Sequence, residues 1–508
     1  MNSLLLTDGY KTGHHQQYPE GTTLVYSNFT PRSNKYAPKG CDEVVVFGTQ
    51  LVVRFLHEHF QQNFFRKGKS EVINEMREEL TMYLGTEYDT THFEALHDLG
   101  YLPIKVKALP EGTLCPMRVP VLTIVNTKPE FYWVTNYLET ILSNLLWKPM
   151  TSATIAYQYK KLLKEWALKT DEKNVDFVDF QGHDFSMRGM DSIDATSFSG
   201  LGHLTSFMGT DSLPAIGAAR QYYDEKGFVG ATVPATEHSV MCAGGKESEI
   251  ETFRRLLATY PTGILSVVSD TWDLWKVLTE YLPEMKDEIM AREGKLVIRP
   301  DSGDPVDIIC GDLDSIHREL KDGSMLAKQL FATYDGDKSY AQHVGVIQLL
   351  WDTFGGTVND QGYKILDSHI GAIYGDSITL ERAQEICHRL EQKGFASTNI
   401  VFGIGSFTYQ YNTRDTFGFA MKATYCEVNG EGQEIFKDPI TDDGIKKSAK
   451  GLLCVSRNTG PANPRYNIPY LIDQCSTQGE ERGMLKVIYE DGDFDNVTTL
   501  TDIRKKLS

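Results

Sequence analysis

The chain has 508 residues, 41% of them hydrophobic and 24% charged, a composition typical of globular proteins and a length that favours two or more domains. Its net charge of −18 disfavours nucleic-acid binding and attachment to an anionic membrane surface, so any phosphate group must meet a local cluster of Arg and Lys. No membrane-spanning apolar run or secretory signal is visible, and the eight cysteines never occur at Cys-x-x-Cys spacing. These features predict a cytoplasmic protein with reduced thiols and no structural zinc.

Residues 1–174 are expected to form the N-terminal part of a β-rich α+β domain. The segment 4–32 contains adjacent His14 and His15, which cannot share a helix face, so a solvated loop is favoured there over a metal site. Apolar and β-branched runs predict strands at 44–48 and within 102–127, and helical spacing predicts helices at 50–61 and 131–147.

A different pattern begins near residue 175 and continues to 407. Short apolar runs end in polar or glycine-rich turns and are separated by longer stretches, one of which, at 380–390, has the spacing of an amphipathic helix. The turns lie at 182–185, 234–238, 269–270, 299–304, 374–377 and 403–406. This repetition predicts an α/β catalytic domain, either a doubly wound sheet or a barrel, and the number of polar strand ends favours an irregular (β/α) barrel.

The turn that follows residues 296–298 has the highest density of charge. It holds Arg299, Asp301, Ser302 and Asp304 between prolines and a glycine, directly after a buried apolar run. Arg299 and Asp301 could simply pair with each other. Taken together with the other turns, however, this segment favours a ligand-binding rim at the carboxyl ends of the strands.

Residues 408–508 are expected to be the C-terminal, β-rich part that packs with the N-terminal domain. Strand-like runs occur at 417–427, 433–436, 452–456 and 484–489, with Asn-Gly and Asp-Gly turns between them. The second domain would therefore be a β-rich α+β domain built from both chain ends.

Several side chains on or near these turns are chemically informative. Single aspartates are commonly caps, but a group of them on one rim can bind hydroxyl groups, stabilise a cation or hold Mg²⁺ together with substrate phosphates. The four candidates are Asp211, Asp270, Asp301 and Asp376. His238 has no histidine four residues away, so it is either structural or a base or nucleophile toward a phosphoryl group. Phe185 and Tyr10 are either core aromatics or stacking surfaces for a flat ring.

The stretch 403–406, Gly-Ile-Gly-Ser, is either a tight turn or a phosphate loop whose backbone amides bind an anion. It is not a dinucleotide fingerprint, because Thr408 replaces the third glycine, and no Walker lysine follows. Arg414 and Lys422 downstream supply the positive charge that a phosphate site needs.

Seven short motifs follow one another along nearly the whole chain. They are Thr7-Asp8-Gly9-Tyr10-Lys11, His183-Asp184-Phe185-x-x-Arg188-Gly189, Gly209-Thr210-Asp211, Val233-Pro234-Ala235-Thr236-Glu237-His238-Ser239, Ser266-Val267-Val268-Ser269-Asp270, Ile298 to Pro305, and Phe436-Lys437-Asp438-Pro439. Together they closely resemble the nicotinamide phosphoribosyltransferase family, a group of type II phosphoribosyltransferases. The resemblance implies an irregular α/β barrel with a β-rich domain from both chain ends, and a homodimer with active sites at its interface.

The resemblance also implies a reaction, the transfer of a phosphoribosyl group from phosphoribosyl pyrophosphate to nicotinamide, with Mg²⁺ and with ATP as a co-substrate. Phe185 and the second subunit's copy of Tyr10 would sandwich the pyridine ring. Asp211 would accept a hydrogen bond from the carboxamide, Ser266 would line the tunnel, and Arg299 would lie near both the amide and the phosphates.

The remaining roles concern the sugar, the phosphates and ATP. Asp301 and Asp376 would hold ribose hydroxyls or metal-bound substrate. His238 matches the histidine that ATP phosphorylates in this family, and Asp270 would orient it. The 5′-phosphate region is matched by Gly405, Ser406, Arg414 and Lys422. Pyrophosphate or the ATP phosphates would be faced by Arg188, Lys437 and Lys446.

Three positions depart from the family pattern. A run of glycines in the phosphate loop is here Gly405-Ser406-Phe407, a serine before the phosphate-site lysine is Ala420, and a tunnel serine is Thr232. The loop therefore has a bulkier edge and its surroundings have one hydroxyl fewer, whereas Thr232 retains a hydroxyl.

Two other functions compete with this one. A nicotinate phosphoribosyltransferase would share the fold and chemistry, but a carboxylate from Asp211 aimed at the ring substituent favours an amide and repels the charge of nicotinate. A non-catalytic ligand-binding protein of the same fold would have no need of His238 alongside Arg299, Asp301 and Asp376.

Overall fold

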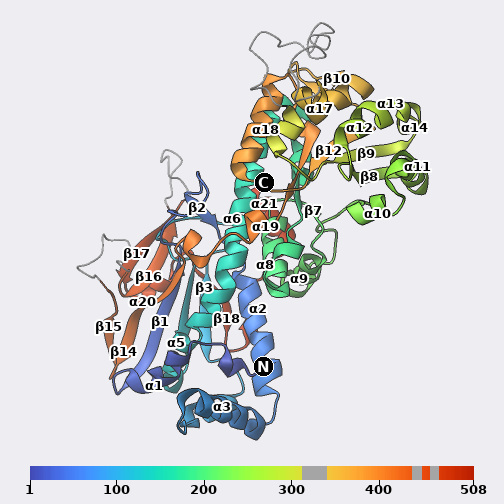
Figure 1. Ribbon diagram of the computed structural model, residues 1–508. Helices are drawn as coiled ribbons and strands as arrows, with labels where there is room; N and C mark the ends of the chain where they lie inside the picture. Colours follow the sequence, from blue (N-terminus) through green and yellow to red (C-terminus); the bar gives the residue numbers. More distant parts are fainter. Residues whose placement is uncertain (312–339, 438–448, 458–467) are drawn as a thin grey trace.

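The computed structural model describes residues 1–311, 340–437, 449–457 and 468–508, and Figure 1 shows two sheet-containing halves connected by a long central helix. One half holds a curled parallel sheet and the other a mainly antiparallel sheet, so the predicted α/β class is confirmed. Lys446, a predicted phosphate-binding residue, lies outside the described residues.

The antiparallel sheet has seven strands in the order β15-β14-β1-β5-β3-β18-β19. The N-terminal strands are β1 (Thr22–Thr30), β3 (Ile104–Ala108) and β5 (Leu122–Asn126). The C-terminal strands are β14 (Ala420–Val428), β15 (Glu431–Glu434), β18 (Lys486–Glu490) and β19 (Asp493–Phe494). Because β14 pairs with β1 and β18 pairs with β3, this sheet is built from both chain ends.

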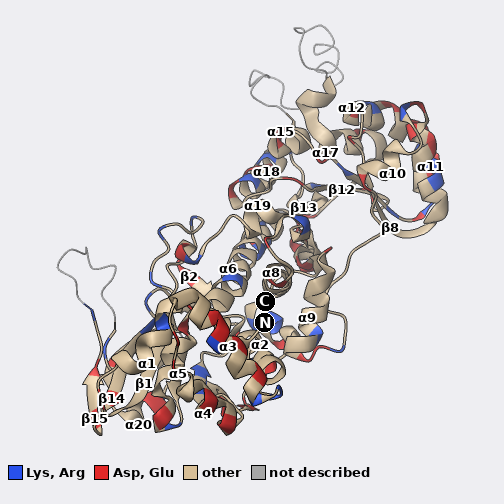
Figure 2. Cartoon of the chain, turned by 60° about the horizontal axis from the view of Figure 1, so that its bottom comes forward, with Lys and Arg blue, Asp and Glu red and all other residues tan. Residues whose placement is uncertain are grey.

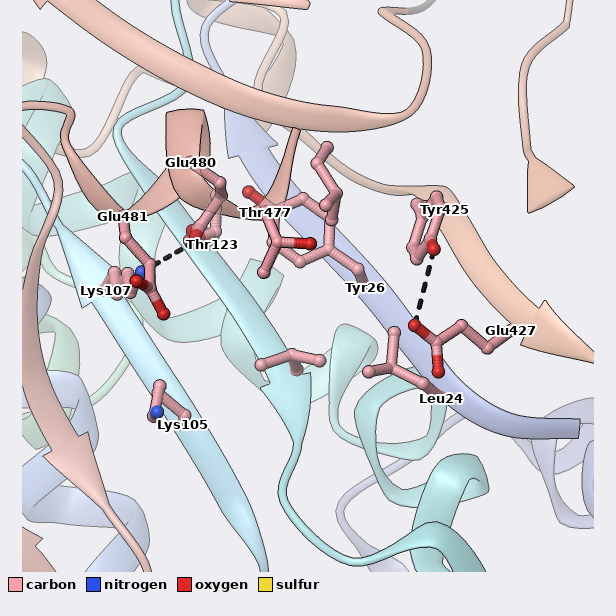
Figure 3. Close-up of a pocket in the computed structure, with 12 residues that line it drawn as sticks. Leu24, Tyr26, Lys105, Lys107, Thr123, Tyr425, Glu427, Thr477, Glu480 and Glu481 are labelled. Atoms are coloured by element: carbon pink, nitrogen blue, oxygen red, sulfur yellow. Dashed lines mark hydrogen bonds and ion pairs between the residues drawn. The ribbon is translucent and has the colours of Figure 1, made fainter. Parts of the chain in front are cut away.

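Alternate residues of these strands face opposite sides of the sheet. Val106 and Ile124 point into a core that also contains apolar side chains of α2 (Thr49–Phe60), α3 (Lys69–Leu84), α4 (Thr91–Leu99) and α5 (Tyr132–Tyr137). Lys107 and Thr123 line a pocket of about 150 Å³ on the other side, where Lys107 forms an ion pair of 2.6 Å with Glu480 of α20 (Thr477–Glu481) (Figure 3). This second face is further covered by the hairpin of β16 (Leu452–Arg457) and β17 (Pro469–Cys475).

Helix α6 (Glu139–Thr170) contributes to the cores of both halves (Figure 1). Its apolar side chains up to Ala153 pack in the core of the sheet-rich half, and those from Ile155 onward pack in the core of the barrel. The helix continues through Pro149, whose neighbours Lys148 and Met150 are also buried. Tertiary packing therefore extends it well beyond the end predicted at residue 147.

The parallel sheet has the strand order β7-β6-β13-β12-β9-β8. Its strands are β6 (Gly182–Asp184), β7 (Gly209–Thr210), β8 (Thr262–Val268), β9 (Glu293–Arg299), β12 (Ile370–Tyr374) and β13 (Ile400–Ile404). The edge strands β7 and β8 are joined by the segment 231–236, which makes isolated parallel bridges from Ala231 to Gly209 and from Ala235 to Ser266. The ring is thus completed by two bridges in place of a strand, the irregular barrel that the sequence predicts.

Helices lie between the barrel strands. They include α8 (Ile193–Leu204), α9 (Leu213–Tyr223), α11 (Glu249–Thr259), α15 (Pro305–Cys310), α17 (Tyr340–Phe354) and α18 (Leu380–Gln392). The predicted helix at 380–390 corresponds to α18, in which Ala383, Cys387 and Leu390 are buried and Thr379 accepts a hydrogen bond from Arg382 N at the helix start. The loop expected at His14 and His15 was wrong, because these residues lie in the short helix α1 (His14–Gln17), and the same N-terminal segment also forms β1.

Acidic residues are spread over several helices, α3 and α4 among them, as Figure 2 shows. Within the described ranges, none of the helices combines the length and the apolar character that a membrane crossing requires. All eight cysteines are free, and four of the six that are buried lie in the two apolar cores.

His92 in α4 makes the sheet-rich half sensitive to acid. Its ring stacks on His15 with centroids 3.8 Å apart, and neither ring nitrogen has a hydrogen-bond partner among the described residues. Burial, aided by the positive charge of His15 when protonated, lowers the pKa of His92 to about 3. The folded state therefore keeps this ring neutral, while the unfolded chain takes up a proton below about pH 6.5. Stability is lost as the pH falls from that value toward 3.

We expect His92→Phe to raise the melting temperature by about 2–6 °C, because a ring of similar shape removes the unpaired buried nitrogens. The gain should be larger at pH 5 than at pH 7.5, since only the wild type then loses stability through protonation. Scanning calorimetry at both pH values measures the difference. A gain that is equal at the two values, or larger at pH 7.5, would contradict this explanation.

Candidate active site

The predicted polar turns converge at the carboxyl ends of the barrel strands. Phe185 follows β6, Asp211 follows β7, and Arg299 ends β9. Because the strands are parallel, these ends lie on one side of the barrel.

Phe185 occupies space that two glycines on neighbouring strands leave open. A Cβ on Gly403 would lie 2.5 Å from Phe185 Cδ2, and a Cβ on Gly375 would lie 3.4 Å from Phe185 Cε2. The same point on Gly375 is 2.8 Å from Asp301 Oδ1 and 3.6 Å from Arg299 Nη1. A flat ring, a carboxylate and a guanidinium group therefore adjoin one another around Gly375.

The carboxylate of Asp211 is held by two donors. His183 Nε2 lies 3.0 Å from Asp211 Oδ1, and Thr232 Oγ1 donates to the same oxygen at 2.5 Å. Burial by itself raises the pKa of Asp211, but the hydrogen bonds from His183 and Thr232 and the charge of Arg299 outweigh it and hold the pKa below its usual value. Asp211 is therefore ionised at neutral pH, and its other oxygen, Oδ2, is not used by these donors.

Arg299 is fixed by one backbone oxygen and one carboxylate. Its Nη2 donates to Thr236 O at 2.9 Å, and its Nη1 lies 3.1 Å from Asp301 Oδ1. Thr236 N in turn donates to Ser266 O at 3.0 Å, so the buried Ser266 belongs to the same wall through the segment that completes the barrel.

His238 stands at the start of α10 (His238–Cys242) beside two aspartates. Its Nε2 lies 4.0 Å from Asp270 Oδ1 and 3.8 Å from Asp301 Oδ2, and its Nδ1 lies 3.1 Å from Thr271 Oγ1. Since carboxylates only accept, this arrangement favours a proton on Nε2 and leaves Nδ1 as the basic nitrogen. The imidazole is about half exposed and accessible to a ligand.

Asp270 connects this histidine to the turn after β9. Its Oδ2 accepts from Asp301 N at 2.9 Å and from Ser302 Oγ at 2.5 Å. Its Oδ1 is buried and has no hydrogen-bond partner among the described residues, so one acceptor position faces His238 unused.

The candidate phosphate loop follows β13, which is separated from β7 by the single strand β6. Gly405 precedes the short helix α19 (Ser406–Tyr409), and a Cβ on Gly189 would overlap Ser406 Oγ, so the turn carrying the exposed Arg188 packs against this loop. Asp376 follows β12 and is also exposed. The pocket of Figure 3 is not part of this site. It lies against the antiparallel sheet, in the other half of the molecule.

Comparison with known proteins decides the family. The profile of the nicotinate phosphoribosyltransferase (NAPRTase) family matches residues 180–491, and that of the nicotinamide phosphoribosyltransferase N-terminal domain matches residues 2–58. The chain belongs to the nicotinate phosphoribosyltransferase family. It is therefore a phosphoribosyltransferase.

Curated relatives cover the chain almost completely. A protein of Acinetobacter baylyi is 50% identical over 100% of this phosphoribosyltransferase and 97% of its own length. One from Mycoplasma pneumoniae is 34% identical over 87% and 93%, and one from Xanthomonas campestris pv. campestris is 31% identical over 99% and 97%. All three bear the name nicotinamide phosphoribosyltransferase.

Two solved structures share the fold. Human nicotinic acid phosphoribosyltransferase has a TM-score of 0.53 at 15% identity, covering 99% of this chain and 92% of its own. A Pyrococcus furiosus protein described as nicotinate-nucleotide pyrophosphorylase has a TM-score of 0.51 at 16% identity, with coverage of 99% and 93%. At this level of identity the likeness concerns the fold alone.

Some predicted site residues of the phosphoribosyltransferase make their contacts away from the strand ends. Tyr10 is 64% exposed and packs edge-on against His14, Arg414 lies 3.8 Å from Asp415, and Lys422 lies 3.7 Å from Glu139. Lys437 is exposed beside the end of a described range. These four residues stay predictions.

Sequence reasoning assigned no role to His183 or Thr271, and it did not predict the contacts of Thr232 or Ser302. His183 and Thr232 hold Asp211, Thr271 contacts His238, and Ser302 donates to Asp270. Each lies within two residues of a predicted site residue or on the segment that completes the barrel. Closeness in sequence to the predicted residues was the signal that could have identified them. The residues that they contact, however, are about 20 to 35 positions away along the chain.

Proposed function

We propose that this phosphoribosyltransferase transfers the 5-phosphoribosyl group from phosphoribosyl pyrophosphate to nicotinamide, giving nicotinamide mononucleotide and pyrophosphate in NAD salvage. The observation that carries the choice of nicotinamide is Asp211, an ionised carboxylate with one oxygen left to accept from an amide. It is held by His183, whose ring centroid lies 4.7 Å from that of Phe185. The names of three curated relatives support the same substrate.

Nicotinate is the second candidate, because the profile that matches most of the chain and a solved structure of the same fold bear its name. Its carboxylate would be placed against that of Asp211, an arrangement in which like charges repel in a partly buried site. Arg299 is nearby but is already engaged by Asp301 and by Thr236 O. The amide is therefore the better match.

The chemical step breaks the bond between ribose C1 and pyrophosphate and forms a bond from C1 to the pyridine nitrogen. That nitrogen carries no proton, so its lone pair attacks without a general base and the product is a pyridinium. The transition state has cationic character at C1, which Asp301 and Asp376 would stabilise while holding ribose hydroxyls. Phe185 would stack on the ring, with Tyr10 of a second copy on the opposite face and Ser266 along the tunnel.

The phosphates need positive charge and amide donors. Gly405 and Ser406 would offer backbone amides to the 5′-phosphate. The departing pyrophosphate would be neutralised by cationic side chains, namely Arg188, Arg414, Lys422, Lys437 and Lys446. In the described ranges no three His, Cys, Asp or Glu side chains form a metal site by themselves, which fits Mg²⁺ held by one or two carboxylates, such as Asp301 and Asp376, together with substrate phosphates. Mg²⁺ so bound supplies positive charge to the leaving group.

ATP would act through His238. Its Nδ1 is the basic nitrogen, so it would attack the terminal phosphorus of ATP and release ADP, while Asp270 and Asp301 stabilise the positive charge on the ring at Nε2. Hydrolysis of the phosphohistidine would then be coupled to product formation. A cytoplasmic setting is part of the same proposal and is supported by eight unpaired cysteines.

Turnover of purified enzyme tests this function. Phosphoribosyl pyrophosphate and Mg²⁺ are supplied with nicotinamide or nicotinate, each with and without ATP, and mononucleotide is quantified. We expect product from nicotinamide, increased by ATP in the wild type but not in His238→Ala. Product from nicotinate alone would overturn the substrate, and ATP stimulation that persists in His238→Ala would overturn the phosphohistidine.

A further inference from the structure

Helix α19 connects the candidate phosphate loop to the strand end that carries Asp211. Ser406 begins this helix and Tyr409 ends it, with the Tyr409 side chain fully buried. The Tyr409 hydroxyl lies 2.7 Å from Nδ1 of the equally buried His203, and Nε2 of His203 lies 2.9 Å from Gly209 O on β7. No step of the proposed reaction uses Tyr409 or His203.

The chemistry of the partners fixes the direction of both hydrogen bonds. A carbonyl only accepts, so His203 Nε2 carries the proton and Nδ1 accepts from the Tyr409 hydroxyl. Burial lowers the pKa of His203 to about 4 and raises that of Tyr409 well above its usual value. Both groups are therefore neutral at physiological pH, and the connection has a single arrangement of donors and acceptors.

Gly209 links this hydrogen-bonded connection to the carboxylate of Asp211. It lies two residues before Asp211, and a Cβ at Gly209 would be 2.7 Å from Nδ1 of His183, the residue that donates to Asp211. The carbonyl of Gly209 is thus fixed by one histidine, while the other histidine packs on its Cα and orients the Asp211 carboxylate.

A second connection leaves α19 in another direction. Thr408 Oγ1 donates to Ile378 O at 2.8 Å, and the hydroxyl of the buried Tyr159 lies 3.2 Å from both of these groups. Ile378 lies two residues after Asp376. The same short helix is therefore attached through Tyr409 to the Asp211 strand and through Thr408 and Tyr159 to the Asp376 turn.

We propose that Tyr409 and His203 are positioning residues that couple the phosphate loop to Asp211, so that a sugar phosphate bound at the loop and nicotinamide bound at Asp211 favour each other. This inference rests on the proposed function. By linkage, the effect is reciprocal, since each ligand strengthens the other by the same factor.

Binding measurements test the coupling without turnover. Calorimetry gives the Kd of nicotinamide with and without saturating ribose 5-phosphate, which occupies the loop but cannot react. We expect the sugar phosphate to tighten nicotinamide binding in the wild type by about tenfold, and Tyr409→Phe to abolish this effect because one buried hydrogen bond is lost.

Tyr159→Phe is the matched control. It also removes a buried hydroxyl that contacts α19, but this hydroxyl belongs to the connection with the Asp376 turn. The variant should therefore weaken ribose 5-phosphate binding and retain the coupling. If Tyr409→Phe does not fold, His203→Gln breaks the same link from the other side while keeping a donor for Gly209 O. Kinetics should agree, with Tyr409→Phe raising the KM for nicotinamide and Tyr159→Phe raising that for phosphoribosyl pyrophosphate.

The outcomes separate this inference from the proposed function. A wild type that neither binds nor converts nicotinamide overturns the function, and the coupling with it. An active wild type without coupling, a Tyr409→Phe variant that keeps it, or two Tyr→Phe variants that lose it equally would each overturn the coupling alone.

Discussion

Replacing Asp211 with Asn is expected to lower kcat/KM for nicotinamide by about 30- to 150-fold, equivalent to about 2–3 kcal/mol for a hydrogen bond to a charged acceptor. The variant keeps the size of the side chain but loses the charge that the His183 and Thr232 donors stabilise. Removing the charge also removes repulsion of a carboxylate substrate. Turnover of nicotinate should therefore rise in the same variant.

The measurement is kcat/KM for nicotinamide divided by kcat/KM for nicotinate, compared between the wild type and Asp211→Asn. Thr232→Ser is the matched control, because it keeps a hydroxyl donor to Asp211 and should leave the preference nearly unchanged. If Asp211→Asn retains the nicotinamide preference of the wild type, Asp211 does not discriminate between the carboxamide and the carboxylate of the substrate.

Gly403→Ala is expected to lower kcat/KM by 100-fold or more. The added Cβ would lie 2.5 Å from Phe185 Cδ2 and 2.7 Å from the Cα of Gly375, and the latter is backbone that cannot rotate away. The Phe185 ring must move, and a displacement of about 1 Å in a group that positions a substrate can cost about 10²-fold. The loss should appear in the KM for nicotinamide as well as in kcat.

Gly217→Ala is the control for the substitution itself. Gly217 lies in α9 with nothing within 4 Å of an added Cβ, so Ala should preserve activity and slightly stabilise the helix. The clash should also lower the melting temperature of Gly403→Ala. The double variant Gly403→Ala with Phe185→Ala should recover part of that loss without recovering activity. Near-normal activity in Gly403→Ala would contradict the placement of the Phe185 ring.

The sequence predicted the barrel best where its local signals agree. At residues 296–304 an apolar run changes abruptly into charged residues between prolines, and the structure ends β9 at that change. Strand β1 could not be recognised in the same way, because its neighbours β5 and β14 are about 100 and 400 residues distant and the pairing supplies the stability. Helix α6 extends beyond its predicted end because buried contacts surround Pro149, and no local sequence pattern indicates such contacts.

The sequence predicted which strand ends carry polar residues but not which of those residues contact each other. Asp270 and Asp301 were expected at one rim, whereas the hydrogen bond from Asp301 N to Asp270 depends on the register of β8 and β9. The same holds for the contact of Gly375 with Phe185, which requires two strands separated by about 190 residues.

The segment 231–236, which completes the barrel, has a consequence for motion. It is attached to β7 and β8 by four backbone hydrogen bonds, whereas β8 and β9 are joined along seven residue pairs. Local opening of a protein begins where the fewest bonds must break, so the ring opens more readily here than between β8 and β9. Thr232 and Thr236 lie on this segment and His238 directly follows it. The donor to Asp211, the acceptor for Arg299 and the phosphoryl-accepting candidate can therefore shift together while the rest of the sheet stays intact.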